Sequence, residues 1–521
     1  MRKTSPSLAK SAALMGVIIL LSKMLGLLRD ILVASAYGTT AEAVAYGCAS
    51  KLPMTIFDFV LGGVVTAAFI PVYNSIAVKK GKQEAMDFAQ SYVNLILLVT
   101  TAIAVLGAVF APSLVRLIAP ELAPETAALA ASLTRIMFPM VIFVGLAFSF
   151  VGFLQSEGEY NIPALISLVS NLIMAGYLVF LNGRFGVRGL SVALLVGWAA
   201  QAFVQLPAVW KRGFRPRLTA PLGTPEIARA ARNTLPILLA TWTTPVCNLI
   251  NTRLASGIEG GRAITALDYA NRLYIILVGL FSFVATNLLF PHFARAAASG
   301  DAAESDRLTR TSLKTLVFLI APIAAGVAVL ARPFIALVYE NGVFTADDTV
   351  MTAAALRMYA VGMVFAACGE VLVKAFFAAE KMRIPMISSL ISMTANVAAV
   401  LGGSALLGER FGVGAIALVS ALSAGVNMTV NLIFALRRGL IRSVGADWAD
   451  IAKSVAAAVL MGAAVWFAAP RLAGYGKLLA VALPTLCGVL VYALLAALFR
   501  SGEMRQIVGK RRKTDGERET E

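Results

Sequence analysis

The sequence predicts an all-α, polytopic membrane protein of about fourteen transmembrane helices, arranged as two parallel six-helix lobes and a C-terminal helix pair. Three observations predict this fold class. Of the 521 residues, 59% are hydrophobic and only 14% are charged, with a mean hydropathy of +0.81, which is too apolar for a soluble surface. The apolar residues form runs of about twenty, the length that spans a bilayer core. Several short motifs recur about 220 residues apart, as in a chain with an internal repeat.

The apolar runs are continuous and do not alternate with polar residues, which favours helices over barrel strands. We expect spanning helices near 11–36, 42–75, 86–112, 127–155, 162–182, 187–210, 233–256, 262–293, 307–331, 346–378, 385–406, 411–436, 448–469 and 475–499.

The net charge of +17 is distributed as in a membrane protein. Of the 45 Lys and Arg residues, about 29 lie in the N-terminus, alternate loops and tail, and about eight in the opposite loops. This positive-inside bias places both termini in the cytoplasm. It also argues against a nucleic-acid partner, although basic loops near the bilayer can contact the headgroups of membrane lipids.

The repeated motifs keep the same order in both halves of the chain. Ala49-Ser50-Lys51-Leu52 matches Ala270-Asn271-Arg272-Leu273, and Phe185-Gly186-Val187 matches Phe411-Gly412-Val413. An even number of helices separates the copies, so both halves share one orientation. We therefore expect five parts, namely an N-lobe (1–210), a cytoplasmic basic linker (211–232), a C-lobe (233–440), a helix pair (441–499) and a disordered basic cytoplasmic tail (500–521).

Several predicted spans carry charged residues, each of which costs about 2.5–3.5 kcal/mol at bilayer depth. The first, second and eighth spans contain the cations Lys23, Arg29, Lys51 and Arg272 and the acids Asp30, Asp58 and Asp268. One interpretation is a cationic cavity for an anion such as a pyrophosphate, which Arg binds with its planar fork and Lys with a point charge. The alternative is a network of intramembrane salt bridges. The excess of cations favours the cavity.

Other charged residues inside spans have a simpler explanation. Glu370 and Lys374 are four residues apart on one predicted helix and can neutralise each other. Arg135 and Arg357 occupy equivalent places in the repeat, so we expect a shared architectural role and keep both as secondary candidates for the site.

The first charged span resembles a known family. Ser22-Lys23-Met24-Leu25-Gly26-Leu27-Leu28-Arg29-Asp30 is similar to the S-R-x-L-G-x-x-R-D pattern of the MurJ/MviN lipid II flippases, part of the multidrug/oligosaccharidyl-lipid/polysaccharide exporter superfamily. Lys51-Leu52-Pro53 with Ala68-Phe69-Ile70-Pro71, and Tyr269-Ala270-Asn271-Arg272-Leu273, extend the resemblance.

The resemblance implies two lobes around a central cavity, in which Lys23, Arg29, Asp30 and Arg272 take the places of family cavity residues. It also implies a groove for the polyprenyl tail in the last two helices. The family usually has Arg where Lys23 stands and Asp where Asn271 stands. After Lys51-Leu52-Pro53 it commonly has an Arg pair and then an acidic residue, where this chain has Phe57, Asp58 and Gly62. The implied function is translocation of lipid II to the outer leaflet of the bacterial inner membrane by alternating access, with cell-wall synthesis proteins as candidate partners.

Three alternative functions make different demands on the sequence. A flippase for another polyprenyl-pyrophosphate-linked glycan would use the same charges. A cation-coupled multidrug exporter would favour intramembrane carboxylates, which is the opposite sign. An enzyme acting on lipid phosphates would need a convergent histidine, nucleophile or metal-carboxylate set, and the chain has one histidine. We therefore predict a transporter without a cofactor, for which Na⁺ or H⁺ is a candidate coupling ion.

Overall fold

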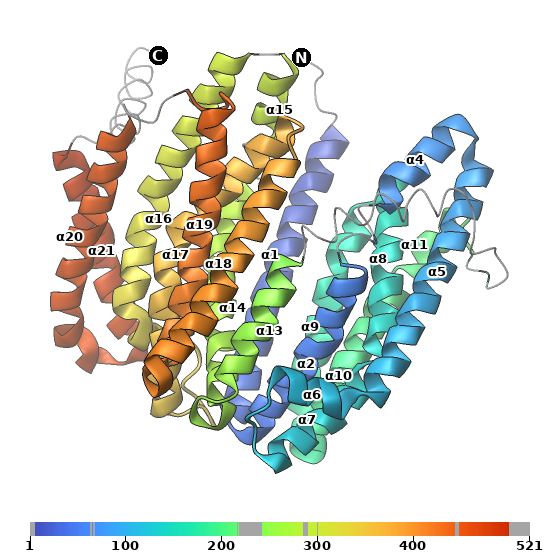
Figure 1. Ribbon diagram of the computed structural model, residues 1–521, viewed down its shortest axis with the longest axis horizontal. Coiled ribbons are helices and arrows are strands. Elements are labelled where there is room, and N and C mark those ends of the chain that lie inside the picture. Colours follow the sequence, from blue (N-terminus) through green and yellow to red (C-terminus); the bar gives the residue numbers. More distant parts are fainter. Residues whose placement is uncertain are drawn as a thin grey trace. The chain divides into compact units, whose positions relative to one another are not determined.

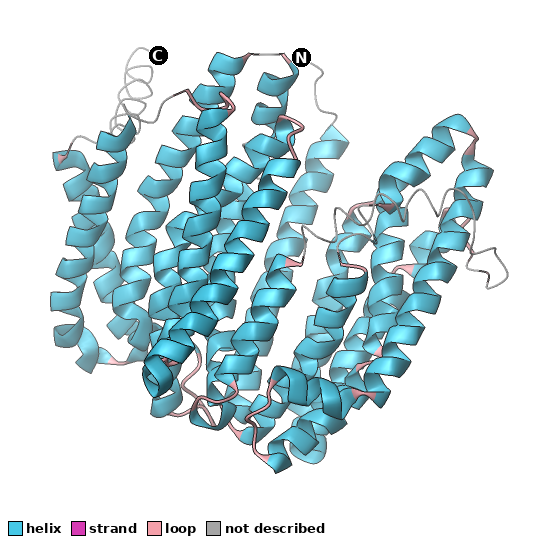
Figure 2. Ribbon diagram, in the orientation of Figure 1, coloured by secondary structure: helices cyan, strands magenta, loops and turns pink. Residues whose placement is uncertain are grey.

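The structure is a computed structural model that describes residues 6–62, 65, 68–215, 217, 242–284, 290–299, 301–442 and 447–499. Helices make up all of its regular secondary structure within these ranges (Figure 2). The predicted linker 211–232 and tail 500–521 lie outside the described residues, except for 211–215 and 217.

The α-helices of the described residues can be followed along the chain by their colours in Figure 1. They are α1 (Pro6–Tyr37), α2 (Ala41–Val60), α4 (Phe69–Lys79), α5 (Lys82–Val109), α6 (Ala111–Ile118), α7 (Pro124–Met137), α8 (Met140–Ser156), α9 (Asn161–Phe180), α10 (Asn182–Phe203), α11 (Leu206–Lys211), α13 (Thr243–Ala255), α14 (Arg262–Val284), α15 (Phe290–Ala298), α16 (Ala302–Val338), α17 (Ala346–Ala378), α18 (Arg383–Leu407), α19 (Val413–Arg437), α20 (Trp448–Leu472) and α21 (Lys477–Leu498).

Nine helices of the described chain are long and apolar enough to cross a membrane, or ten if the bent pair α7–α8 forms one span. Each of the fourteen predicted ranges overlaps at least one helix. The helices α1, α2 and α14, which carry the candidate charged residues, are not among the nine. The chain is thus an all-helical, multi-pass membrane protein, as predicted.

Helix breaks fall within several of the predicted spans, among them 42–75 and 127–155. Within the range 42–75, α2 ends at Val60, close to Gly62 with its φ of 45°, and α4 begins at Phe69. The range 127–155 bends by 41° between α7 and α8, where Pro139 removes a backbone donor.

The described chain divides into two compact units. Unit 1 comprises residues 1–265 and 342–344, and unit 2 comprises residues 266–341 and 345–521. In unit 1, α9 packs against α1 and α10, and α2 packs against α7. In unit 2, α17 packs against α16 and α19, and the helix pair α20–α21 packs against α16.

Helix boundaries support the internal repeat. The helices α2 and α14 begin at Ala41 and Arg262, which are 221 residues apart. The bent pair α7–α8 and the continuous helix α17 begin and end 222 residues apart, from Pro124 to Ser156 and from Ala346 to Ala378.

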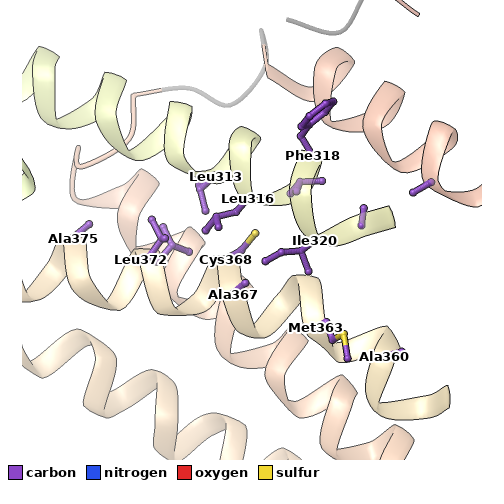
Figure 3. Packing of buried hydrophobic residues seen from close by; sticks show 14 of the residues in the cluster. Leu313, Leu316, Phe318, Ile320, Ala360, Met363, Ala367, Cys368, Leu372 and Ala375 are labelled. Atoms are coloured by element: carbon purple, nitrogen blue, oxygen red, sulfur yellow. The ribbon is translucent and has the colours of Figure 1, made fainter. Parts of the chain in front are cut away.

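Small side chains let the helices of unit 2 approach closely around an apolar core. Leu313, Leu316 and Ile320 of α16 face Ala367 and Cys368 of α17 in Figure 3, and all five are buried. This spacing of three and four residues places the α16 side chains on one face. On the other side of α17, a Cβ atom on Gly362 would lie 2.9 Å from Ala421 of α19, so glycine permits this close crossing.

Candidate functional site

Helix α1 carries the first group of candidate site residues. It runs from Pro6 to Tyr37 as one continuous helix of 32 residues. Lys23 is exposed on it, and the structure shows no ion pair or hydrogen bond for this lysine within the described ranges. An ammonium group in this setting is available to an anion that enters from outside the helix bundle.

Arg29, by contrast, forms three hydrogen bonds to two residues of its own unit. Its Nη2 donates to Asp30 Oδ1 at 2.7 Å and its Nε to the same oxygen at 3.1 Å. Its Nη1 donates to Asn171 Oδ1 on α9 at 2.9 Å. The Arg29 side chain is 19% exposed and that of Asp30 is 12% exposed. Arg29 therefore fits the salt-bridge interpretation of the sequence, whereas Lys23 fits the cationic interpretation.

Helix α2 carries Lys51 and Asp58, both half-buried. Asp58 lies in the last turn of α2, where the partial negative charge of the helix end disfavours a carboxylate. No ion pair or hydrogen bond is found for it anywhere in the described structure. Phe57, beside it, is 1% exposed and its ring stacks 6.3 Å from that of Phe148. Phe57 is thus a core residue of unit 1.

Helix α14 in unit 2 carries Asp268, Asn271 and Arg272. The first two are half-buried and Arg272 is exposed. Arg272 is the eleventh residue of α14, as Lys51 is the eleventh residue of α2. The repeat therefore places a cation at the same position of one helix in each unit.

The secondary candidates Arg135 and Arg357 are exposed on α7 and α17. Arg357 Nε donates to the carbonyl oxygen of Ala328 on α16 at 3.2 Å, which is an architectural contact within unit 2. Glu370 and Lys374 form the predicted ion pair along α17, with Nζ and Oε1 3.4 Å apart. This prediction is confirmed.

The reasoning from sequence missed Asn171, the residue of α9 that contacts Arg29. Its side chain is nearly buried, at 8% exposure. The available signal was an amide side chain inside an otherwise apolar span, because such side chains commonly form hydrogen bonds between membrane helices. The sequence does not indicate which helix this amide contacts.

The fold is that of an all-helical, multi-pass membrane protein, and solved transporter structures share it. The solved structure "Lipid II flippase MurJ, inward closed conformation" is similar to this chain, with a TM-score of 0.76 at 23% sequence identity. The similarity covers 94% of this chain and 98% of that one. An inward-facing multidrug resistance MATE family transporter of the MOP superfamily gives a TM-score of 0.66 at 16% identity, over 82% of this chain and 98% of that one.

Sequence comparison identifies the family. Residues 33–490 match the family model described as "Lipid II flippase MurJ". The probable lipid II flippase MurJ of Rhizobium meliloti is 30% identical over 94% of this chain and 92% of its own length. The lipid II flippase MurJ of Burkholderia cenocepacia is 27% identical over 70% of this chain and 72% of its own length. The chain belongs to the MurJ family of lipid II flippases, which are transporters and not enzymes.

Proposed function

We propose that this chain translocates lipid II from the cytoplasmic to the outer leaflet of the bacterial inner membrane by alternating access, with both termini in the cytoplasm. The observation that carries the proposal is Lys23, an exposed lysine without a partner in the described structure, inside the α1 motif that resembles the family pattern. A lone cation within a membrane helix is costly, and an anionic pyrophosphate would neutralise it.

Each unit supplies candidate residues for the substrate. In unit 1 we assign Lys23 and Lys51 to direct contact with the pyrophosphate. Arg29, while paired with Asp30, is assigned to contact with the same pyrophosphate. In unit 2, taken by itself, Arg272 is our candidate for contact with the lipid-linked anion, because it is exposed on α14 and holds the position equivalent to Lys51. We expect the secondary candidates to influence the electrostatic potential around these cations. They are Asp58, Asp268, Asn271, Arg135 and Arg357.

The membrane potential supplies a direction for export. Moving one elementary charge across 100 mV is worth about 2.3 kcal/mol. An inside-negative potential therefore drives an anionic headgroup outward. The same potential pulls cationic helices inward, so it can also reset the empty carrier.

A depletion experiment tests the function. The chain is depleted in its bacterium, and lipid-linked precursors are extracted and assigned to a leaflet. We expect lipid II to accumulate on the cytoplasmic side. Accumulation of a different polyprenyl-pyrophosphate glycan would instead support the second candidate function, which the buried Phe57 and the acidic Asp58 favour because the family commonly has arginines there.

Complementation of the depleted strain tests the residues. Lys23→Ala is expected to abolish growth while membrane levels of the protein stay normal. Lys374→Ala is the matched control, because that lysine lies on a membrane helix but is paired with Glu370. Full complementation by Lys23→Ala would reject the assignment of Lys23. Reporter fusions at each end test the cytoplasmic placement of the termini.

A further inference from the structure

Asn171 contacts one face of α1 at two points. Its Oδ1 accepts from Arg29 Nη1 at 2.9 Å, and its Nδ2 donates to the carbonyl oxygen of Ser22 at 3.2 Å. Ser22 and Arg29 are seven residues, or two turns, apart and therefore lie on the same helix face. A single amide side chain thus connects the start and the end of the charged motif.

Gly26 lies between these two contacts and makes them sterically feasible. A Cβ atom at this position would lie 3.3 Å from Asn171 Nδ2, which is a tighter approach than van der Waals contact allows without adjustment. The glycine of the motif therefore leaves room for the amide of α9.

The Arg29–Asp30 ion pair alone does not fix the direction of the guanidinium. Residues i and i+1 of a helix point about 100° apart, and neighbours in sequence do not face each other. Arg29 must turn sideways along the helix to reach Asp30. The guanidinium is planar, so a third contact at Nη1 fixes the plane as well as the position of its donors.

We propose that Asn171 is a positioning residue for Arg29, which holds the guanidinium beside Asp30 in the orientation that meets the substrate pyrophosphate. This inference rests on the proposed function, because it assigns Asn171 a part in recognition of the lipid-linked anion. Its contribution is preorganisation, since a guanidinium that is already ordered loses less rotamer entropy when the anion binds.

A double-mutant cycle tests the inference. The purified full-length protein is titrated with a polyprenyl pyrophosphate in detergent, with the corresponding polyprenyl alcohol as the uncharged probe. The proteins are the wild type, Asn171→Ala, Arg29→Ala and the double variant. Ser170→Ala is the matched control, because Ser170 is also 8% exposed on α9 but bonds within its own helix, to Ser167 at 3.2 Å.

We expect Asn171→Ala to weaken pyrophosphate binding about tenfold and Arg29→Ala about a hundredfold, as for the loss of one and of several charge-assisted hydrogen bonds. The double variant should bind no more weakly than Arg29→Ala, since Asn171 acts through Arg29. Ser170→Ala should stay within about twofold of the wild type.

The outcomes separate this inference from the proposed function. If Asn171→Ala has its full effect in the Arg29→Ala background, Asn171 acts on the helix packing, and the positioning role is rejected while the function stands. An unchanged affinity for Asn171→Ala rejects it equally. If the wild type binds the alcohol as well as the pyrophosphate, the proposed recognition of the anion itself fails.

A second variant covers the case in which Asn171→Ala does not fold. Asn171→Asp keeps an oxygen acceptor for Arg29 and adds a charge that competes with the phosphate oxygens. We expect weaker pyrophosphate binding than in the wild type, and no difference between Asp and Asn once Arg29 is replaced by Ala. A persistent difference in that background would overturn the inference.

Discussion

Arg310 of α16 and Asp447, the residue that precedes α20, form an ion pair in which Nε and Oδ2 are 2.5 Å apart. Lys314 Nζ lies 2.9 Å from the other oxygen of Asp447. Asp306 contacts Arg310 at 3.3 Å and accepts the backbone N–H of Arg442 at 2.8 Å. This network of unit 2 joins the start of the helix pair α20–α21 to α16.

Asp447→Asn should destabilise unit 2. Asp447 is 3% exposed, and removing its charge leaves two partly buried cations without their main partner, at a cost of about 2–3 kcal/mol. Thermal unfolding in detergent measures the effect. Glu304→Gln is the control, since the Glu304–Arg307 pair is exposed and 3.7 Å long, and its loss should cost at most about 0.5 kcal/mol. Equal shifts in the two variants would contradict the importance of the network.

The stability contributed by Asp447 should disappear in acid. Burial alone would raise the pKa of this carboxyl, but hydrogen bonds from Arg310 and Lys314 and their charges outweigh it and lower the pKa below the ordinary value of 3.8. A lowered pKa gives stability that is fully present above the ordinary value and is lost as the pH falls through the folded-state value. The difference in Tm between the wild type and Asp447→Asn should therefore be constant above about pH 5 and shrink below about pH 4. A difference that grows on acidification would contradict this sign.

Glu157 should behave in the same way in unit 1. Burial raises the pKa of its carboxyl, but hydrogen bonds from Lys82 and Tyr73, together with the charges of Lys82 and Arg212, lower it overall. The two hydrogen bonds are each 2.8 Å long. Glu157→Gln should therefore lower the Tm at neutral pH and have less effect as the pH falls below the ordinary value of 4.5. Thermal unfolding of the wild type and Glu157→Gln across that pH range tests this prediction. A Tm difference that does not change with pH would argue against an ionic role for Glu157.

Gly107 of α5 should not tolerate a side chain. A Cβ atom there would overlap the ring of Phe138, at 1.9 Å, and Phe138 is fully buried next to the bend between α7 and α8. We expect Gly107→Ala to cost about 1–3 kcal/mol through overpacking, measured by thermal unfolding. Gly176→Ala in α9 is the matched control, because a Cβ atom there meets nothing within 4 Å. If both variants were equally stable, the packing at the bend would be looser than described.

The pair Glu370–Lys374 should be dispensable for transport. Its members neutralise each other along α17, so replacing both by Gln removes two compensating charges. Complementation by the double variant is expected to equal that of the wild type, with a stability change of at most about 0.5 kcal/mol. Loss of growth at normal protein levels would instead place this pair in the transport mechanism.

The sequence predicts those features of the fold that depend on local spacing. Continuous apolar runs located the helices, and the separation of four residues predicted the contact of Glu370 with Lys374. The motif matches also predicted the equivalence of Lys51 and Arg272, each the eleventh residue of its helix.

Features that depend on tertiary contacts could not be predicted in this way. Positive charges outnumber negative charges in the α1 motif, but whether Arg29 is neutralised depends on a rotamer and on Asn171, 142 residues away. Helix α2 ends close to Gly62, whose φ is 45°, but glycine is also common in continuous membrane helices.

In the proposed mechanism, Lys23 binds the anionic headgroup of the transported lipid. The most direct measurement is the rate of lipid II translocation in vesicles that contain the purified protein, compared among the wild type, Lys23→Arg, Lys23→Glu and Lys374→Glu. We expect wild-type rates for Lys23→Arg, a loss of about a hundredfold or more for Lys23→Glu, and a much smaller effect for Lys374→Glu. Equal rates for Lys23→Glu and the wild type would contradict this mechanism.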